Sequence, residues 1–378
     1  MNINSKYSYA ISSFLEVDND QIFTYWKGRV ALYCALKAIG VGKGDEVILP
    51  AFTCVVVPNA ILYLGANPVY VDIEKRSLCS SVSQIESKIT ANTKCIIIQN
   101  MLGLSYEVEE IINLSKLNNI YTIEDCTHGF GGKYNGSFNG TRADFSFYST
   151  QWNKPFSTGI GGILYVKNES LIKSMELINN DLKKPSKKNV IVLKILIFAR
   201  SYFLKNWSYW FFLKLYRFLS SNGIVVGSSS SSELGKIELP KDYLLSLSNV
   251  QAKKGLIELK NFNQKLKQRF KNGLIINEWM RMNDKIFIPN NLLKNHSFLK
   301  YPIFVKNREK FLLIAEKNKI PIGDWFISPL HPLKGGFSKW NLEISDYPNS
   351  TEISSKILNL STDSINFDFL EKYKDQIL

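Results

Sequence analysis

Lys154 is the residue of this chain best placed to act as a reactive amine. It lies between an aromatic, hydroxyl-rich stretch at 143–150 and a turn of small residues at 157–162. A lysine that is partly removed from water loses its proton more easily, and its neutral amine can then form a Schiff base with an aldehyde. The alternative is a lysine exposed in a surface turn. The neighbouring residues must therefore distinguish a pocket lysine from a surface lysine.

Asp125 is a second candidate for chemistry. It follows an apolar strand predicted at 119–123, so it falls at the C-terminal end of a strand, where open α/β sheets place their ligands. A carboxylate there can pair with a protonated pyridine nitrogen and keep that ring an electron sink. Together with Lys154 this indicates pyridoxal phosphate (PLP), an aldehyde with such a ring. Asp125 could instead be a helix N-cap.

Gly28 precedes a pattern with helical spacing. The periodic apolar positions are Ala31, Leu32, Ala35, Leu36 and Ile39, which predict a helix that begins just after 28–30. Free N–H groups at a helix N-terminus attract phosphate, and a glycine permits close approach. We therefore expect Val30 and Ala31 to bind the cofactor phosphate, unless Gly28 simply caps a buried helix.

Strands and helices are predicted to alternate through the first half of the chain. Strands are expected at 46–49, 68–72 and 95–99, and helices at 55–64, 82–89 and 108–117. Alternating βα units predict an α/β fold with a mostly parallel sheet covered by helices on both faces, a large three-layer domain. Right-handed crossovers would bring Asp125, Ser149 and Lys154 to the same edge of that sheet.

The acid, the lysine and the glycine-rich turn resemble the fold-type I PLP enzymes. More narrowly, they are similar to the DegT/DnrJ/EryC1/StrS sugar aminotransferases. Six further blocks match that family in order, at 28–32, 44–53, 65–73, 247–252, 301–302 and 329–332.

The resemblance implies roles for single residues. Lys154 would hold PLP and move a proton, Asp125 would keep the ring nitrogen protonated, and Ser149, five residues before the lysine, would bind the phosphate. Cys54 stands where relatives carry an aromatic residue, so stacking on the ring would pass to His128. His128 could otherwise satisfy a backbone group at the strand end.

The substrate side departs further from the family pattern. Trp325 and His331 lie in a stretch at 325–332 that resembles a substrate-side loop, although it also fits a proline-stiffened packed turn. Ile160 replaces a frequent glutamate. Leu244 lies near the point where relatives place an asparagine that reaches the phosphate of the neighbouring subunit in a homodimer.

The family implies an aminotransferase that moves an amino group from an amino acid, glutamate being the expected donor, to a nucleotide-linked keto-deoxysugar. The product would serve surface polysaccharide, lipopolysaccharide or amino-sugar biosynthesis. One alternative is a sugar dehydratase that uses pyridoxamine phosphate, a branch in which histidine replaces the lysine. Another is a catalytically idle relative that acts as a membrane-associated scaffold.

Composition suits a large globular enzyme. The chain has 378 residues, of which 45% are hydrophobic and 21% charged. We expect a PLP-binding domain at 1–255, interrupted by an insertion at about 183–235, and a smaller α+β domain at 256–378. The second domain would contain strands at 301–305 and 357–360 and a helix at 308–318.

The insertion is apolar, aromatic and basic. Lysines and arginines interrupt its apolar runs before they reach the ~20 residues of a spanning helix. Lys194, Ser201, Lys205 and Ser208 recur at helical spacing, which predicts one polar stripe on an interfacial helix. Four lysines, at 183, 184, 187 and 188, suit an anionic membrane surface bound through 187–219. The segment could instead pack against its own domain or a partner subunit.

The formal net charge of +14 favours anionic partners: nucleotide diphosphates, phospholipids or nucleic acid. Nucleic acid is the least favoured, because the basic residues are scattered and form no recognition motif. The five cysteines are an odd number without metal-ligand spacing, and no signal peptide is evident. We expect a cytoplasmic protein without a metal site, peripheral to the inner face of the membrane if the insertion binds lipid.

Overall fold

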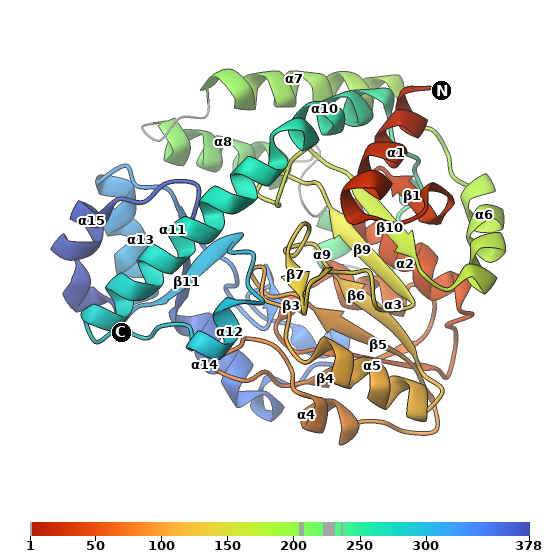
Figure 1. Ribbon diagram of the computed structural model, residues 1–378, viewed down its shortest axis with the longest axis horizontal. Helices are drawn as coiled ribbons and strands as arrows, with labels where there is room; N and C mark the ends of the chain where they lie inside the picture. Colours follow the sequence, from red (N-terminus) through yellow and green to blue (C-terminus); the bar gives the residue numbers. More distant parts are fainter. Residues whose placement is uncertain (1, 204–207, 222–230, 236) are drawn as a thin grey trace.

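The computed structural model describes residues 2–203, 208–221, 231–235 and 237–378 and is built on a seven-stranded sheet (Figure 1). Its strand order is β1-β10-β9-β6-β5-β2-β4. The strands are β1 (Ile22–Tyr25), β2 (Glu46–Pro50), β4 (Asn67–Val71), β5 (Thr93–Gln99), β6 (Tyr121–Asp125), β9 (Phe145–Ser149) and β10 (Gly162–Val166). The five from β4 to β9 run parallel, and β10 and β1 add antiparallel strands at one edge. The predicted, mostly parallel sheet is confirmed.

Helices cover both faces of this sheet because side chains alternate along its strands. Val47 and Leu49 pack in one core cluster, whereas Ile48 between them belongs to another. The first face is covered by α2 (Gly28–Ala38), α3 (Val56–Leu62) and α6 (Ile172–Asn180). The second is covered by α4 (Val82–Glu86) and α5 (Val108–Leu117), and beside β10 by α1 (Ile3–Leu15) and α10 (Asn249–Lys260). The large unit therefore has the expected three layers.

Two boundaries near the site differ from the sequence prediction. Helix α2 begins at Gly28, three residues earlier than expected, because Lys27 is extended and serves as its N-cap. Strand β6 is displaced toward the C-terminus, since Asn119 adopts a left-handed conformation (φ 54°) in the turn after α5. Asp125 is consequently the last residue of β6.

A smaller antiparallel sheet lies in the C-terminal part of the chain, in the order β11-β14-β12. Its strands are β11 (Lys300–Phe304), β14 (Ile357–Ser361) and β12 (Ile322–Gly323), and its helices include α11 (Phe262–Met282), α12 (Asn290–Leu293), α13 (Arg308–Lys317), α14 (Pro348–Lys356) and α15 (Phe367–Lys372). These match the predicted strands and helix. Helix α10 continues through position 255, so we propose that the two units divide at its junction with α11.

Two short strands join the two parts of the chain beside the pocket. The strand β3 (Thr53–Cys54) pairs in parallel with β13 (Leu330–His331). A separate hairpin consists of β7 (Lys133–Tyr134) and β8 (Ser137–Phe138).

The described part of the insertion contains three helices, α7 (Lys187–Phe203), α8 (Tyr209–Ser221) and α9 (Ser231–Gly235). The inner side of α7 packs on the large unit, since Leu193 is buried against Trp26 and Ile160. Its outer side is apolar: Ile191, Ile195, Phe198 and Tyr202, at helical spacing, are 55–63% exposed.

The predicted polar stripe on this segment was wrong. Ser208 is buried and donates to the carbonyl of Phe203, because α7 ends there and α8 starts a new helix axis. Lys205 lies outside the described residues. Among the helices that the structure describes, none combines the length and hydropathy needed to cross a bilayer.

Candidate active site

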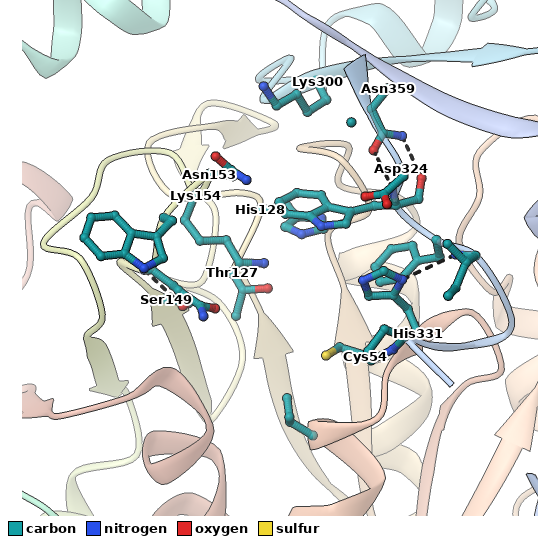
Figure 2. A pocket seen from close by; sticks show the side chains of 18 of the residues that line it. Cys54, Thr127, His128, Ser149, Asn153, Lys154, Lys300, Asp324, His331 and Asn359 are labelled. Atoms are coloured by element: carbon teal, nitrogen blue, oxygen red, sulfur yellow. Dashed lines mark hydrogen bonds between the residues drawn. The ribbon is translucent and has the colours of Figure 1, made fainter. Parts of the chain in front are cut away.

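A pocket of about 1380 Å³ opens where the parallel strands end (Figure 2). Strands β5, β6 and β9 each direct a polar residue into it: Gln99, Asp125 and Ser149. The pocket also contains the other sequence-predicted residues Cys54, His128, Lys154, Trp325 and His331. Parallel strands place their C-terminal ends at one edge, which explains why residues from 54 to 331 meet there.

Lys154 lies on a loop that is held on two sides. At the base of the loop, the N–H of Thr158 donates to the carbonyl of Thr150 at 2.8 Å, and their hydroxyls lie 2.6 Å apart. Arg269 donates to the carbonyl of Pro155 at 2.8 Å. Burial lowers the pKa of Lys154 to about 8, against the opposing attraction of the Asp125 carboxylate. The loop therefore presents an amine that is easily deprotonated.

Asp125 is a buried, fixed carboxylate. One of its oxygens accepts the N–H of Thr127 at 2.9 Å. Burial raises the pKa of Asp125, while hydrogen bonds from Thr127 and the nearby Lys154 charge oppose that rise. The side chain is therefore oriented and keeps one face toward the pocket.

His128 makes the contact with a backbone group that was one of the two roles predicted for it. Its Nδ1 accepts the N–H of Leu102 at 3.2 Å, which leaves the ring proton on Nε2. Burial, together with the Lys154 and His331 charges, lowers the pKa of His128 well below its usual range, so the ring is neutral. Its flat face stacks on the indole of Trp325, with centroids 4.9 Å apart and planes within 3°.

Trp325 lines the pocket beside both Lys154 and His128. The Lys154 Nζ lies 4.8 Å from the centroid of the indole ring, on which His128 also stacks. Asn359 fixes the backbone of Trp325 by accepting its N–H at 3.1 Å and donating to its carbonyl at 2.8 Å. His331 approaches from the β3–β13 pairing, where it lies opposite Cys54.

The first turn of α2 packs against Ser149. A Cβ atom added to Gly28 would lie only 3.0 Å from the Cβ of Ser149, so the glycine is needed for this close approach. Val30 and Ala31, predicted to bind phosphate, are fully buried and do not line the pocket. The structure places Gly28 and Arg29 on the pocket wall instead, because the helix begins three residues earlier than predicted.

Sequence reasoning missed a buried ion pair beside this turn. Arg29 pairs with Glu233 from α9, and both side chains are less than a tenth exposed. Burial alone would lower the pKa of Arg29, but the Glu233 carboxylate outweighs it and raises the pKa. The two residues are 204 positions apart, and no local pattern signals their pairing.

The structure explains why Ile160 replaces the glutamate common in the family. Its side chain is buried with Trp26 and Leu193, so it forms part of the surface that receives α7. Its carbonyl accepts the amide of Gln251 at 2.6 Å, which ties the glycine turn to α10.

Comparison with known proteins identifies the family. The model of the DegT/DnrJ/EryC1/StrS aminotransferase family matches residues 6–199 and 214–365. GDP-perosamine synthase of Escherichia coli O157:H7 is 43% identical over 148 residues, which cover 39% of this chain and 41% of that relative. A UDP-N-acetyl-3-dehydro-alpha-D-glucosamine 3-aminotransferase of Acidithiobacillus ferrooxidans is 34% identical over 154 residues, 40% of this chain and 42% of that relative.

The chain thus spans about two fifths of the length of these curated relatives. A crystal structure of a DegT/DnrJ/EryC1/StrS aminotransferase from Brucella abortus superimposes with a TM-score of 0.73 at 18% identity, over 98% of this chain and 88% of that one. The family match covers most of the sequence and includes the lysine, the aspartate and the glycine turn. The chain therefore belongs to the DegT/DnrJ/EryC1/StrS aminotransferase family.

Proposed function

We propose that the protein is a PLP-dependent aminotransferase that transfers an amino group from an amino acid, with glutamate as donor, to a nucleotide-linked keto-deoxysugar. The product would enter surface polysaccharide or amino-sugar biosynthesis. The observation that carries this proposal is the meeting of Lys154 and Asp125 in one pocket, on a loop and a strand end that are both fixed by hydrogen bonds.

The residues present fit PLP. An amine of low pKa faces the pocket, a buried carboxylate lies beside it, and Ser149, packed against Gly28, lines the same pocket with its hydroxyl-bearing side chain. When bound, PLP supplies an aldehyde that reacts with amines and a ring that stores the electron pair released from a donor carbon.

Each side chain then has a definite task. Asp125 holds a proton on the ring nitrogen, His128 offers a neutral flat face, and Lys154 moves the proton of the donor carbon. At pH 8 about half of the Lys154 side chains are neutral, against about 0.3% for a lysine with the ordinary pKa of 10.5. Burial on the loop is thus the main cause that prepares the base.

The alternatives are less well supported. A dehydratase of the related branch would carry histidine in place of Lys154. A catalytically idle scaffold would have no reason to keep a depressed lysine pKa next to a buried aspartate. The names of the two curated relatives also favour amino transfer to a nucleotide-linked sugar.

Absorbance and turnover test the proposal. The purified protein with PLP should be yellow, glutamate should bleach it, and a nucleotide-linked keto sugar should restore the colour. Lys154→Ala should lose both the colour and turnover while its melting curve stays cooperative. Turnover retained in Lys154→Ala would refute the assignment.

The outer face of α7 supports a second element of the proposal, binding to an anionic membrane surface from the cytoplasmic side. Four apolar side chains project outward, and the exposed Lys187, Lys188 and Lys194 lie on the same helix. Each basic residue near an anionic bilayer adds ~1 kcal/mol of attraction, which salt screens.

Liposome flotation tests this surface. The parent protein should float with vesicles that contain anionic lipid at low salt and be partly released at high salt, and Phe198→Glu should abolish flotation. Leu313→Glu, at a residue 67% exposed on α13, is the matched control and should float normally. If the parent protein does not float with anionic vesicles at low salt, the proposed membrane binding is wrong.

We also propose a homodimer with the pocket near the subunit interface. Apolar side chains exposed on α11, including Phe270 and Leu274, support a protein contact there. Sedimentation should give a dimer at the concentration of the activity assay. A monomer that turns over would contradict it.

A further inference from the structure

One wall of the pocket is basic and lies beside the Lys154 loop. Arg200 from α7 and Lys300 from β11 line it, and Figure 2 shows Lys300 above Asn153 and Lys154. None of the roles assigned above uses these two cations.

Arg200 is tied directly to the lysine loop. Its guanidinium donates to the side-chain oxygen of Asn153 at 2.8 Å, and it lies 5.2 Å from the ring centroid of Trp152. Both partners immediately precede Lys154. The family match stops at residue 199 and resumes at 214, so Arg200 belongs to a stretch outside it. The insertion therefore contributes a cation of its own to the pocket.

Positive charge exceeds negative charge at this wall. Arg269 binds Asp363 through two hydrogen bonds, at 2.7 and 3.3 Å, so the Asp363 carboxylate is already engaged. Within the described part of the chain, the Lys300 ammonium makes no hydrogen bond or ion pair. Burial lowers the pKa of Lys300 to about 8, and the charges of Arg269, Lys265 and Arg200 also lower it, which places these four cations around one carboxylate.

A diphosphate sets two anionic groups against such a cluster and can neutralise it, and arginine is well suited to phosphate because its planar fork matches two oxygens. We infer that Arg200 and Lys300 form the subsite for the diphosphate of the sugar substrate, next to the loop that carries Lys154. This inference rests on the proposed function, and it adds that the insertion takes part in substrate binding.

A diphosphate ester can come from two sources. One is a nucleotide-linked sugar in solution, and the other is a sugar linked through diphosphate to a polyprenyl lipid. The lipid-linked source is tested as well, because α7 carries both Arg200 and the exposed apolar face. The sugar carbonyl would in either case extend from the subsite toward Lys154.

Calorimetric titration with GDP, UDP and GMP tests the subsite without catalysis. Arg200→Gln and Lys300→Gln should each weaken binding of the preferred diphosphate by about tenfold or more, since each removes a charge-assisted contact. The tenfold or greater preference expected for GDP over GMP should shrink in both variants. Lys88→Gln, at an exposed lysine that does not line the pocket, is the control and should bind as the parent does. PLP absorbance and melting temperature report whether the variants are folded.

The outcomes separate this inference from the proposed function. Weaker diphosphate binding in both variants supports a nucleotide source. If the parent binds no nucleotide but binds vesicles containing polyprenyl diphosphate more tightly than vesicles of equal charge without it, and Arg200→Gln loses that difference, the subsite stands with a lipid source. Parent-like diphosphate binding in both variants, or no binding of either probe by the parent, overturns it. Bleaching of the parent by glutamate tests amino transfer independently of these results.

Discussion

Replacing Lys154 with methionine should stabilise the cofactor-free protein. The pKa of this amine falls from 10.5 to about 8, which corresponds to an upper limit of about 3 kcal/mol for keeping it charged in the pocket. The side chain is only partly buried, and water screens the remaining part, so we expect a gain of about 1–2 kcal/mol at pH 7. For a chain of this length, that is roughly 1–3 °C in melting temperature.

The pH dependence identifies the cause. Between about pH 8 and 10.5 the unfolded lysine binds more protons than the folded one, so the stability of the parent rises with pH in that window. The advantage of Lys154→Met should therefore be full below pH 8 and fall by roughly half or more at pH 9.5. Burial also lowers the pKa of Lys27 and Lys300 to about 8, but these groups are present in both proteins and cancel in the difference.

Thermal melts of both proteins without PLP, at pH 7 and at pH 9.5, provide the measurement. The exposed Lys88→Met variant should show no gain at either pH. A gain for Lys154→Met that is equal at both pH values would mean that better packing of methionine, not charge burial, stabilises the variant. A loss of stability at pH 7 would refute the argument for a lysine held ready for deprotonation.

Three further substitutions test separate parts of the site. Asp125→Asn keeps the shape and the acceptor for Thr127 but removes the charge, so turnover should fall by about 100-fold or more while melting changes little; equal turnover would remove Asp125 from the mechanism. Gly28→Ala places a methyl group against Ser149 and should weaken PLP binding by about tenfold in an absorbance titration, whereas Gly42→Ala, with nothing within 4 Å, should not. Glu233→Gln should lower the free energy of unfolding, measured with denaturant, by about 3 kcal/mol, because it removes the carboxylate that neutralises buried Arg29. Adding Arg29→Met to this variant should lower the free energy of unfolding only a little further. Additive losses from the two single substitutions would show that the two side chains act separately.

The alternation of strands and helices could be predicted from the sequence because each element has a local pattern of apolar residues. Short continuous apolar runs mark β2 and β5, and three- and four-residue spacing marks α2 and α5. The sequence predictions were wrong at the ends of elements, where the conformation of one residue sets the boundary. Asn119 adopts a left-handed turn, and β6 therefore begins later than predicted. Lys27 is extended, so α2 begins at Gly28, and Gly28 and Arg29 are the helix residues that face the pocket.

The sequence alone determined the family, and it predicted Lys154 and Asp125 as the reactive pair, because both lie in ordered motifs whose spacing is set within one sheet. It did not determine what the insertion does, since a helix with apolar residues all round can bury any face. Tertiary structure decided that Leu193 faces Ile160, that Arg200 reaches Asn153 and that Glu233 meets Arg29. Pairings between distant segments depend on how the whole chain packs, and a local pattern carries no information about them.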